Sequence, residues 1–484
     1  MNKNYIAFSI AGILALGVVS PVALAELTLP SGADRRPNLS LDPFERAREA
    51  MRKLPKSEPK EETPEPKREQ ELVPQPEAVP AQTAPVVQKT AEIEEHADAF
   101  SYEFAVTMDA FSLTSGGPIQ NLDDPDEEFV EKKTGVVGVV NFVAEVDTGA
   151  ADLWDNGLFF LYSALTFGEG PIVGDLHGIS NIDAGGNTMR VVELWYEHSF
   201  PHSNSSALLG LHDFNGEFYV SEYASLFANA GFGLGQALGE HGGPSGYPVT
   251  TLGLRLKSEV TENSYFQVAM YDGGIKEEEG DAEFDKVISV NLDKNEGVFV
   301  GAEAGLFKNE PGDSSGYYKI ALGMWYLRQD QPGFETGELD QNQEPVTILG
   351  DNPKAGTGGA YLLAETSIGE KMGIFFKHGR AREDYLQFSQ FYAAGINFSG
   401  AIPGRDDDVL GIGMVHTRQS PAYIDQLPEE TQTYVAETAF EITYTAQITD
   451  WLMIQPDFQY IQYPSMDPTM TKSSVVGVRA QAVF

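Results

Sequence analysis

Two short motifs carry residue types that could perform hydrolysis or bind a metal. Residues 312–316 read Gly-Asp-Ser-Ser-Gly and match the G-x-S-x-G pattern of a serine nucleophile. That nucleophile requires a strand followed by a helix, whereas these residues form a turn between two predicted strands. His198 and His202 have the spacing of two metal ligands on one helix, but Pro201 lies between them and prevents that helix. Neither motif has the structural context that its chemistry needs.

Two further features, a glycine-rich stretch and the many carboxylates, are also weak evidence for enzyme activity. Gly231, Gly233 and Gly235 lack the third glycine of a dinucleotide-binding loop and follow no βαβ pattern. Paired carboxylates could serve as general acid and base, but in a chain with 72 Asp and Glu they are uninformative. We therefore expect no enzyme activity and no cofactor.

Composition excludes further classes of protein. The 484-residue chain has only 32 Lys and Arg, so its net charge is −40, and nucleic-acid phosphates are bound by the opposite charge. The absence of cysteine excludes disulfides, thiol catalysis and Cys-ligated zinc. We expect no nucleic-acid partner.

Residues 1–25 are typical of a cleaved signal peptide. Lys3 precedes an apolar run over residues 5–19, and Ala23-Leu24-Ala25 supplies the small residues before the cleavage site. An uncleaved anchor helix is the alternative, but the run is shorter than the roughly 20 apolar residues that span a bilayer. No other segment is apolar for that length, so we expect the mature chain to enter a membrane only as a closed β-barrel.

Residues 26–98 have the composition of a disordered segment. They are rich in Pro, Glu and Lys and contain a single aromatic residue, so they bury too little apolar surface to offset the entropy of ordering. Asp42-Pro43-Phe44-Glu45 is a helix-start signal and predicts a short amphipathic helix over residues 43–54. This helix either docks on a partner or on the barrel mouth, or it is only nascent.

From residue 99 onward the sequence alternates between polar and apolar residues. Leu254 and Leu256, for example, share one face of a strand, while Arg255 and Lys257 lie on the other. The alternation predicts sixteen strands, over residues 102–112, 134–147, 157–167, 188–198, 207–214, 250–259, 264–272, 298–307, 317–327, 359–368, 371–380, 390–399, 408–417, 434–447, 450–460 and 473–484.

The connections between these predicted strands alternate between long and short. An outer-membrane barrel has this pattern, because its periplasmic turns are brief and its outer loops are long. The last strand is amphipathic and ends on Phe484, which resembles the assembly signal of bacterial outer-membrane barrels. We therefore predict an all-β fold for residues 99–484, a sixteen-stranded antiparallel transmembrane barrel with a water-filled lumen. It would lie in the outer membrane, with both termini and the disordered segment in the periplasm.

A series of local motifs follows in order along this domain. Residues 174–182 read Gly-Asp-Leu-His-Gly-Ile-Ser-Asn-Ile and include Asp175 and Asn181, and residues 193–197 read Glu-Leu-Trp-Tyr-Glu. Near the C-terminus, residues 400–413 contain Pro-Gly-Arg followed by Asp and a Gly-x-Gly pair, with the first three at Pro403, Gly404 and Arg405. Further blocks lie at residues 211–214, 220–227, 247–255 and 268–273. Together these blocks resemble the carbohydrate-selective outer-membrane porin family over about residues 100–484.

The resemblance implies a pore that passes monosaccharides, glucose above all, and related polyols down their gradients. Aromatic faces would bury the C–H side of a pyranose, and charged groups would hydrogen-bond its hydroxyls. On the predicted register, the lumen-facing candidates for sugar binding are Arg255, Lys257, Glu193, Glu197, Trp195, Lys377, Glu437, Glu441 and Arg479. Each of them could instead only solvate the pore wall or belong to the aromatic girdle.

The acid excess leaves a second function open. The acidic stretches 123–131, 276–285 and 335–344 are predicted outer loops, where divalent cations could bridge carboxylates to one another or to lipopolysaccharide phosphates. If the lumen is acidic as well, the chain is a general cation-preferring diffusion porin.

Two other functions and an assembly state also stay open. The barrel could anchor the envelope while residues 26–98 bind the cell wall or a periplasmic partner. A lipid hydrolase in the wall would need an outward Ser and His, and only His378 has the register and place for this, without an identifiable partner. A homotrimer is expected by analogy with other sixteen-stranded pores.

Overall fold

The computed structural model describes most of the domain that follows residue 98. The described residues are 99–118, 133–183, 186–239, 245–273, 288, 297–311, 316–328, 334–339, 345–348, 356–383, 386–427 and 431–484. The expected signal peptide, the segment 26–98 with its expected helix, the acidic stretches 123–131 and 276–285 and the two serines of the 312–316 motif lie outside them. No side chain within residues 335–344 is described. Among the described residues, none forms a helix that is long and apolar enough to cross a membrane.

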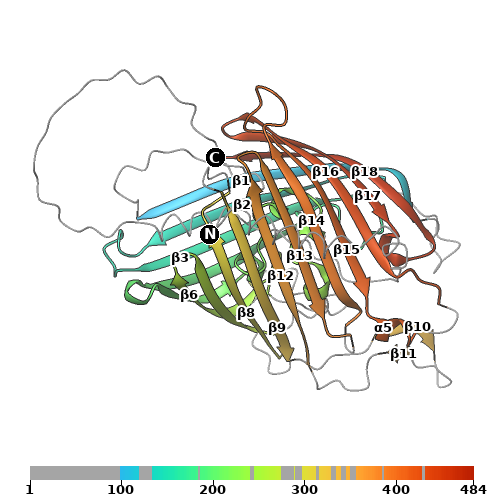
Figure 1. Ribbon diagram of the computed structural model, residues 1–484, viewed down its shortest axis with the longest axis horizontal. Coiled ribbons are helices and arrows are strands. Elements are labelled where there is room, and N and C mark those ends of the chain that lie inside the picture. Colours follow the sequence, from blue (N-terminus) through green and yellow to red (C-terminus); the bar gives the residue numbers. More distant parts are fainter. Residues whose placement is uncertain are drawn as a thin grey trace, which may run out of the picture.

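Sixteen antiparallel strands close into one barrel (Figure 1). Each strand pairs with its neighbours along the chain, and the last strand closes on the first, with Asp109 opposite Arg479. The strands are β1 (Phe100–Pro118), β2 (Thr134–Asp147), β3 (Gly157–Glu169), β4 (Thr188–Phe200), β5 (Ser205–His212), β6 (Thr251–Thr261), β7 (Ser264–Asp272), β8 (Val298–Lys308), β9 (Tyr318–Arg328), β12 (Thr357–Ile368), β13 (Met372–Ala381), β14 (Phe388–Ser399), β15 (Val409–Gln419), β16 (Ala436–Thr449), β17 (Leu452–Gln462) and β18 (Met470–Val483).

The remaining elements are short and lie in the connections. A two-stranded sheet is formed by β10 (Phe334–Leu339) and β11 (Pro345–Ile348). The helical turns are η1 (Pro201–Ser203), η2 (Phe214–Gly216), η3 (Ala224–Leu226), η4 (Ala230–Phe232), α4 (Gln236–Gly239), α5 (Pro421–Ile424) and η5 (Pro464–Met466).

The predicted strands are confirmed in number, order and pairing, with small differences at their ends. The largest functional difference concerns the fifth strand, which was expected to reach residue 214 but ends at His212. The side chain of Asp213 accepts a hydrogen bond from the backbone N–H of Asn215, which bends the chain into η2. The strand therefore stops where the chain turns into the barrel.

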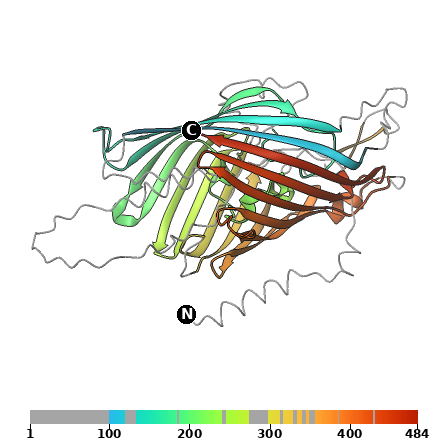
Figure 2. The ribbon, with the colours of Figure 1, turned by 90° about the horizontal axis from the view of Figure 1, so that it is seen from above.

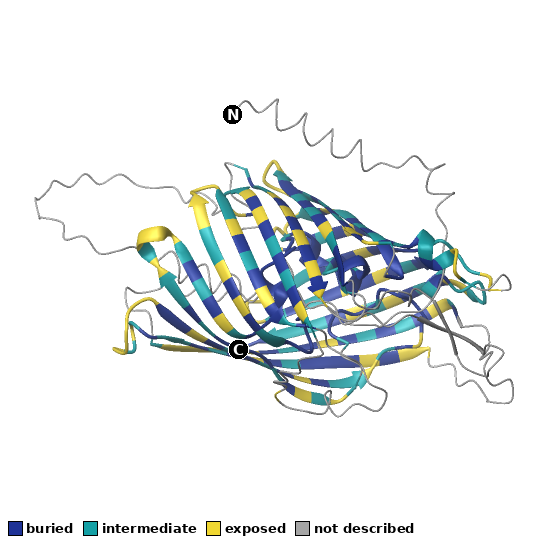
Figure 3. Ribbon diagram, turned by 90° about the horizontal axis from the view of Figure 1, so that it is seen from below, coloured by how far each residue is buried: buried dark blue, intermediate teal, exposed yellow. Residues whose placement is uncertain are grey.

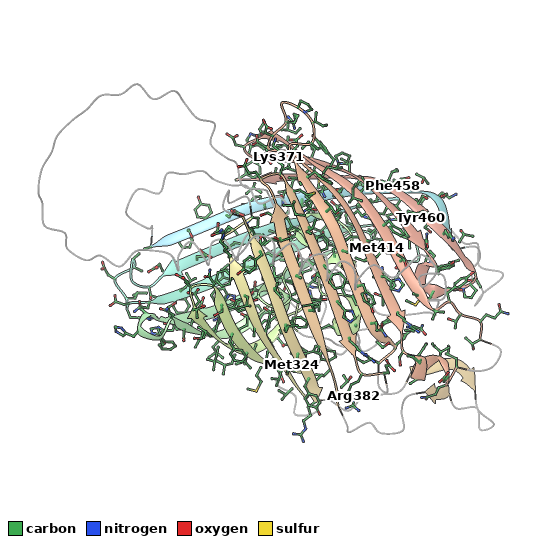
Figure 4. All side chains as sticks on the ribbon, viewed as in Figure 1. Met324, Lys371, Arg382, Met414, Phe458 and Tyr460 are labelled. Carbon is green, nitrogen blue, oxygen red and sulfur yellow. The ribbon has the colours of Figure 1, made fainter. Side chains whose placement is uncertain are left out.

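The two faces of the wall have opposite chemistry, as the alternation predicted. Leu254 and Leu256 on β6 are 39% and 48% exposed on the outer face, whereas Arg255 between them is fully buried inside. Figure 3 shows this alternation as bands of exposed and buried residues along the strands. Met324 and Phe458, labelled in Figure 4, are further apolar side chains on the outer face. An apolar outer face is what contact with lipid requires.

The interior is filled in part by the chain itself. The connection between β5 and β6 folds inward, and Figure 2 shows the light-green segment surrounded by strands. We call its described residues 213–239 the inner loop. Its aromatic rings stack on one another, with centroids 4.4 Å apart for Phe214 and Phe218 and 4.2 Å apart for Phe227 and Phe232. The expected water-filled lumen is therefore narrowed by an apolar cluster that the strand pattern did not reveal.

Glycine allows the inner loop to approach the wall closely. Gly235 has φ +76°, and a Cβ atom there would lie 2.6 Å from the ring of Phe391 on β14. Any other residue would be strained and would displace that ring. The glycine-rich stretch around Gly233 thus serves packing inside the barrel.

Candidate functional site

Wall carboxylates hold the backbone of the inner loop at its start and middle. Glu303 on β8 accepts the N–H of Tyr219 at 2.8 Å. Glu365 on β12 accepts the hydroxyl of Ser221 at 2.6 Å and the N–H of Glu222 at 3.2 Å. Both carboxylates are at most 3% exposed. Charged acceptors form strong hydrogen bonds, which offset part of the cost of burying the charge.

Two carboxylates of β16 continue this series. Glu441 accepts the N–H groups of Ala228 and Asn229 at 2.6 and 2.9 Å. Glu437 accepts the N–H of Leu176 at 2.7 Å and contacts Nδ1 of His177 at 2.9 Å. The last two residues belong to the connection between β3 and β4, whose described residues 170–183 also fold inward. The predicted residues Glu437 and Glu441 thus each hold one of the two inward segments.

Arg255 ties the inner loop to two wall strands. Its guanidinium makes two hydrogen bonds to Glu217, at 2.5 and 2.7 Å, and one each to Glu197 at 2.9 Å and to the hydroxyl of Ser206 at 2.6 Å. Arg255 and Glu197 were predicted to face the lumen, but Glu217, which is on the inner loop, was not. All three charged side chains are buried. The paired arrangement stabilises the inner loop against β4 and β6.

Arg479 ties residues 170–183 to the wall. Its guanidinium makes a bidentate contact with Asp109 on β1, at 2.7 and 2.8 Å, and donates to the side-chain oxygen of Asn181 at 2.6 Å. Asp109 also accepts the hydroxyl of Ser180 at 2.7 Å. Asp175, the other motif residue here, accepts the N–H of Gly178 at 2.6 Å and so shapes the turn. The motif residues of this segment therefore have structural contacts within the barrel.

Lys377 approaches the inner loop from β13. Its ammonium donates to the carbonyls of Phe232, at 3.1 Å, and of Gly233, and it lies 4.2 Å from the ring centre of Tyr219. Tyr219 has φ +60°, a conformation that is costly for a bulky side chain and that persists only where its surroundings enforce it. Glu303 and Lys377 together hold it there.

Trp195 and Glu193 lie at the point where the inner loop begins. The indole of Trp195 donates to Glu193 at 3.0 Å and stacks on Phe160 with centroids 4.6 Å apart. Glu193 also accepts the N–H of Asp213 at 3.2 Å. Burial, and then repulsion by Glu193, raises the pKa of the Asp213 carboxyl to about 7. Because Asp213 also accepts the N–H of Tyr247 at 3.3 Å, it joins the beginning and the end of the inward connection.

The remaining predicted residues lie away from this cluster or at its edge. Lys257 is half-buried, with its ammonium 5.7 Å from the ring centre of Tyr265. Pro403, Gly404 and Arg405 lie in the turn between β14 and β15, at the opposite end of the barrel from the inner loop. There Arg405 binds Asp408 through two hydrogen bonds, at 2.7 and 2.8 Å. This motif thus shapes a turn.

A narrow pocket of about 10 Å³ lies between the inner loop and the wall. Two of its polar atoms, the hydroxyl of Tyr219 and the side-chain oxygen of Asn215, are buried and have no hydrogen-bond partner among the described residues. Its lining consists of Asn181, Asn215, Tyr219, Val220, Ser221, Ala224, Ser225, Phe227, Asn229, Phe232, Gly233 and Lys377. Amides, hydroxyls and a cation beside aromatic rings have the chemistry of a contact with a polyhydroxylated molecule, and the pocket has room for a group the size of one hydroxyl or water.

The motifs that suggested other chemistry are separated in the fold. His198 lies on β4 and His202 in η1, so they do not share a helix. Within the described parts of the chain, no group of three His, Asp or Glu side chains is arranged to hold a metal. The acidic stretches expected to bind divalent cations are not among the side chains that the structure describes.

The family follows from comparison with known proteins. The family model described as carbohydrate-selective porin, OprB family, matches residues 134–484. The chain belongs to this family. Porin B of Pseudomonas aeruginosa is 21% identical to this porin over 342 residues, which cover 65% of this chain and 72% of the relative. The high-pH structure of Pseudomonas putida OprB shares its fold, with a TM-score of 0.60 at 16% identity, over 80% of this chain and 94% of that one.

Membership in this family makes the protein an outer-membrane carbohydrate-selective porin, and the channel fold points to a transporter rather than an enzyme. The predicted family and fold class are therefore confirmed. Sequence reasoning missed the inner loop of the porin as the main part of the site, and with it Asn215, Glu217 and Tyr219. The signal was present, because a connection so rich in Phe and Tyr is typical of a segment that packs in a core.

Proposed function

We propose that this porin is a passive, selective pore for monosaccharides such as glucose and for related sugars and polyols. The observation that carries the proposal is the pair of buried polar atoms, the Tyr219 hydroxyl and the Asn215 oxygen, which have no hydrogen-bond partner among the described residues and lie in a narrow pocket beside Lys377 that one sugar hydroxyl would fill. A sugar hydroxyl both donates and accepts, so it would satisfy both atoms. The rings of Phe227 and Phe232 in the same lining provide apolar faces for its C–H groups.

We assign two roles to the nine charged or aromatic wall residues. Lys377 lines the pocket and contacts the sugar directly. The other eight position the inward segments or line the pore beside them: Glu193, Trp195, Glu197, Arg255, Lys257, Glu437, Glu441 and Arg479. Their contacts with the loop backbone and with loop side chains support this division.

The orientation is part of the proposal. The start of β1 and the end of β18 lie at the end of the barrel that has the short turns, because an even number of strands returns the chain to the end where it started. Short turns face the periplasm in barrels of this class. We therefore place residues 26–98 in the periplasm, where they are available to a periplasmic partner, and the long connections outside. Assembly as a homotrimer remains a proposal by analogy.

Conductance through a planar bilayer tests the sugar site. We expect glucose to block the ion current of the purified porin in a saturable way. Tyr219→Phe should weaken that block roughly 2- to 10-fold, because it removes one hydroxyl worth about 0.5–1.5 kcal/mol in a hydrogen bond. Tyr460→Phe, on the outer face (Figure 4), is the matched control and should leave the block unchanged. A current that glucose does not affect in the wild-type porin would contradict the proposal.

A general cation-preferring pore is the second candidate. Its supporting observation is that Glu303 and Glu365 are buried on the inner wall and accept hydrogen bonds from neutral groups. Their negative charge raises the local concentration of cations in the lumen. Reversal potentials in a salt gradient, measured in the same bilayers, separate the two candidates: cation bias without sugar block favours the general pore.

A further inference from the structure

A polar patch interrupts the apolar outer face of the wall near the end that carries the inner loop. His378 of β13 is paired in register with Tyr392 of β14, which is paired with His416 of β15. The imidazole of His378 stacks on the Tyr392 ring with centroids 4.4 Å apart. One step nearer the rim, two arginines flank Gln390 in the same register. We call the five residues His378, Arg380, Tyr392, His416 and Arg418 the outer-wall patch.

The patch lies at the boundary of the apolar belt. Directly below it, the outer face of the same strands and of β16 presents Phe376, Ile412, Met414 and Phe440. Ile412 and Phe440 are 46% and 39% exposed, as lipid-facing side chains are. Arg382, the residue after β13, is labelled at this rim in Figure 4, while Lys371 is at the other end of the strand. The patch therefore lies where headgroups and acyl chains of a lipid leaflet meet.

The patch has cationic and donor groups that the protein does not use fully. His416 is 4% exposed; its Nδ1 contacts the hydroxyl of Thr438 at 2.8 Å, but its buried Nε2 has no partner among the described residues. The buried Nε of Arg418 has none there either. Arg380 pairs with one acid, Glu383, at 3.1 Å. Among the described residues of this part of the wall, the two guanidinium groups thus have a single carboxylate partner, Glu383.

We propose that the outer-wall patch binds the phosphate group of an anionic lipid, with Arg380 and Arg418 on the phosphate and the acyl chains along Met414 and Ile412. A guanidinium offers a fork of donors that matches phosphate oxygens, and its charge is favourable at an anionic leaflet. With the orientation proposed above, the lipid belongs to the outer leaflet. The sugar pocket lies on the opposite face of the wall, so the two sites are independent.

Lipid retention tests the site. The full-length porin is reconstituted in nanodiscs of phosphatidylcholine with a small fraction of phosphatidic acid, extracted gently, and analysed by native mass spectrometry for bound lipid. We expect the wild type to retain phosphatidic acid over phosphatidylcholine, and Arg380→Gln with Arg418→Gln to reduce this preference at least about tenfold. Lys308→Gln removes one charge from the outward face of β8 at the other rim and should leave the preference unchanged.

Three further outcomes decide the proposal. Arg380→Lys with Arg418→Lys keeps the charge and should retain an intermediate preference, because the forked geometry is lost. Free inorganic phosphate at millimolar concentration should not displace the lipid, since it lacks the acyl chains. An equal loss of the preference for phosphatidic acid in the Lys308→Gln control would overturn the proposal. So would arginine variants that keep this preference and only lose an oligomer in lipid-free detergent. Unchanged glucose block in all variants verifies that the barrel is folded.

Discussion

The inward segments are attached to the barrel wall in two chemically different ways. Arg255 and Arg479 form paired anchors, in which a buried guanidinium binds buried carboxylates. Glu303 and Glu365 form single-sided anchors, in which a buried carboxylate binds backbone N–H and hydroxyl groups. A paired anchor offsets carboxylate charge with a guanidinium, whereas a single-sided anchor leaves its negative charge without a cation in contact among the described residues. The first kind therefore sets the position of the segments, and the second sets both their position and the electrostatics of the lumen.

The largest expected effect comes from removing the cation of a paired anchor. Arg255→Met leaves the carboxylates of Glu217 and Glu197 buried without their partner, which costs about 3–5 kcal/mol. We expect a lower midpoint of thermal unfolding in detergent and loss of the glucose block. The triple change Arg255→Met, Glu217→Gln and Glu197→Gln should recover much of the midpoint, because it also removes the carboxylate charges. A single variant as stable as the wild type would show that the pair does not hold the inner loop.

A smaller effect is expected at a single-sided anchor. Glu365→Gln keeps one acceptor oxygen for Ser221 and Glu222 but loses the charge, so bonds worth about 1.5–3 kcal/mol each become ordinary ones. The inner loop should then fluctuate more, seen as larger noise in single-channel current, and the reversal potential should become less cation-selective. Glu259→Gln, at an exposed position on β6, is the control with the same change of charge. An identical shift in both variants would mean that the lumen charge is not what determines selectivity.

A pH-dependent effect is expected where the inner loop begins. The pKa of Asp213 is raised from its ordinary 3.8 to about 7 when the inner loop is packed against the wall, which we call the closed state. Between these two pH values the closed state keeps a proton on Asp213 that a solvated carboxyl would release. Closure is therefore most stable at low pH and weakens as the pH rises from about 4 to about 7. Current fluctuations should increase over this range in the wild type. Asp213→Asn cannot ionise, and its fluctuations should not change with pH; a pH response equal to that of the wild type would contradict this assignment.

The smallest effect is expected at Lys257, which is only half-buried, whereas the residues of both kinds of anchor are buried. Its half-buried ammonium lies 5.7 Å from the Tyr265 ring centre, a contact worth about 0.5–1 kcal/mol at such a site. Lys257→Gln should shift the unfolding midpoint only slightly and make the pore somewhat more cation-selective. A loss of stability as large as that of Arg255→Met would show that Lys257 also holds the inner loop.

The wall was predictable because each strand has to satisfy two solvents at once. Leu254 and Arg255 differ in burial and face because lipid lies on one side of the strand and the lumen on the other. Adjacent residues of a strand point to opposite faces, so the sequence alternates between apolar and polar residues. The same register placed Arg255, Lys377 and Glu441 on the inner face correctly. Their partners Glu217, Phe232 and Ala228 were not predictable. These residues belong to a connection whose sequence has no regular alternation of polar and apolar residues.

The sequence by itself therefore determined the barrel: sixteen strands, their order, their pairing and the two faces of the wall. Period two and short turns are local properties, so neighbouring residues are enough to specify them. Only the tertiary structure decided where the inner loop lies and which backbone groups meet Glu303, Glu365 and Glu441. Those hydrogen bonds join residues far apart in the chain. They form only once the barrel closes around the inner loop, so no local sequence pattern predicts them.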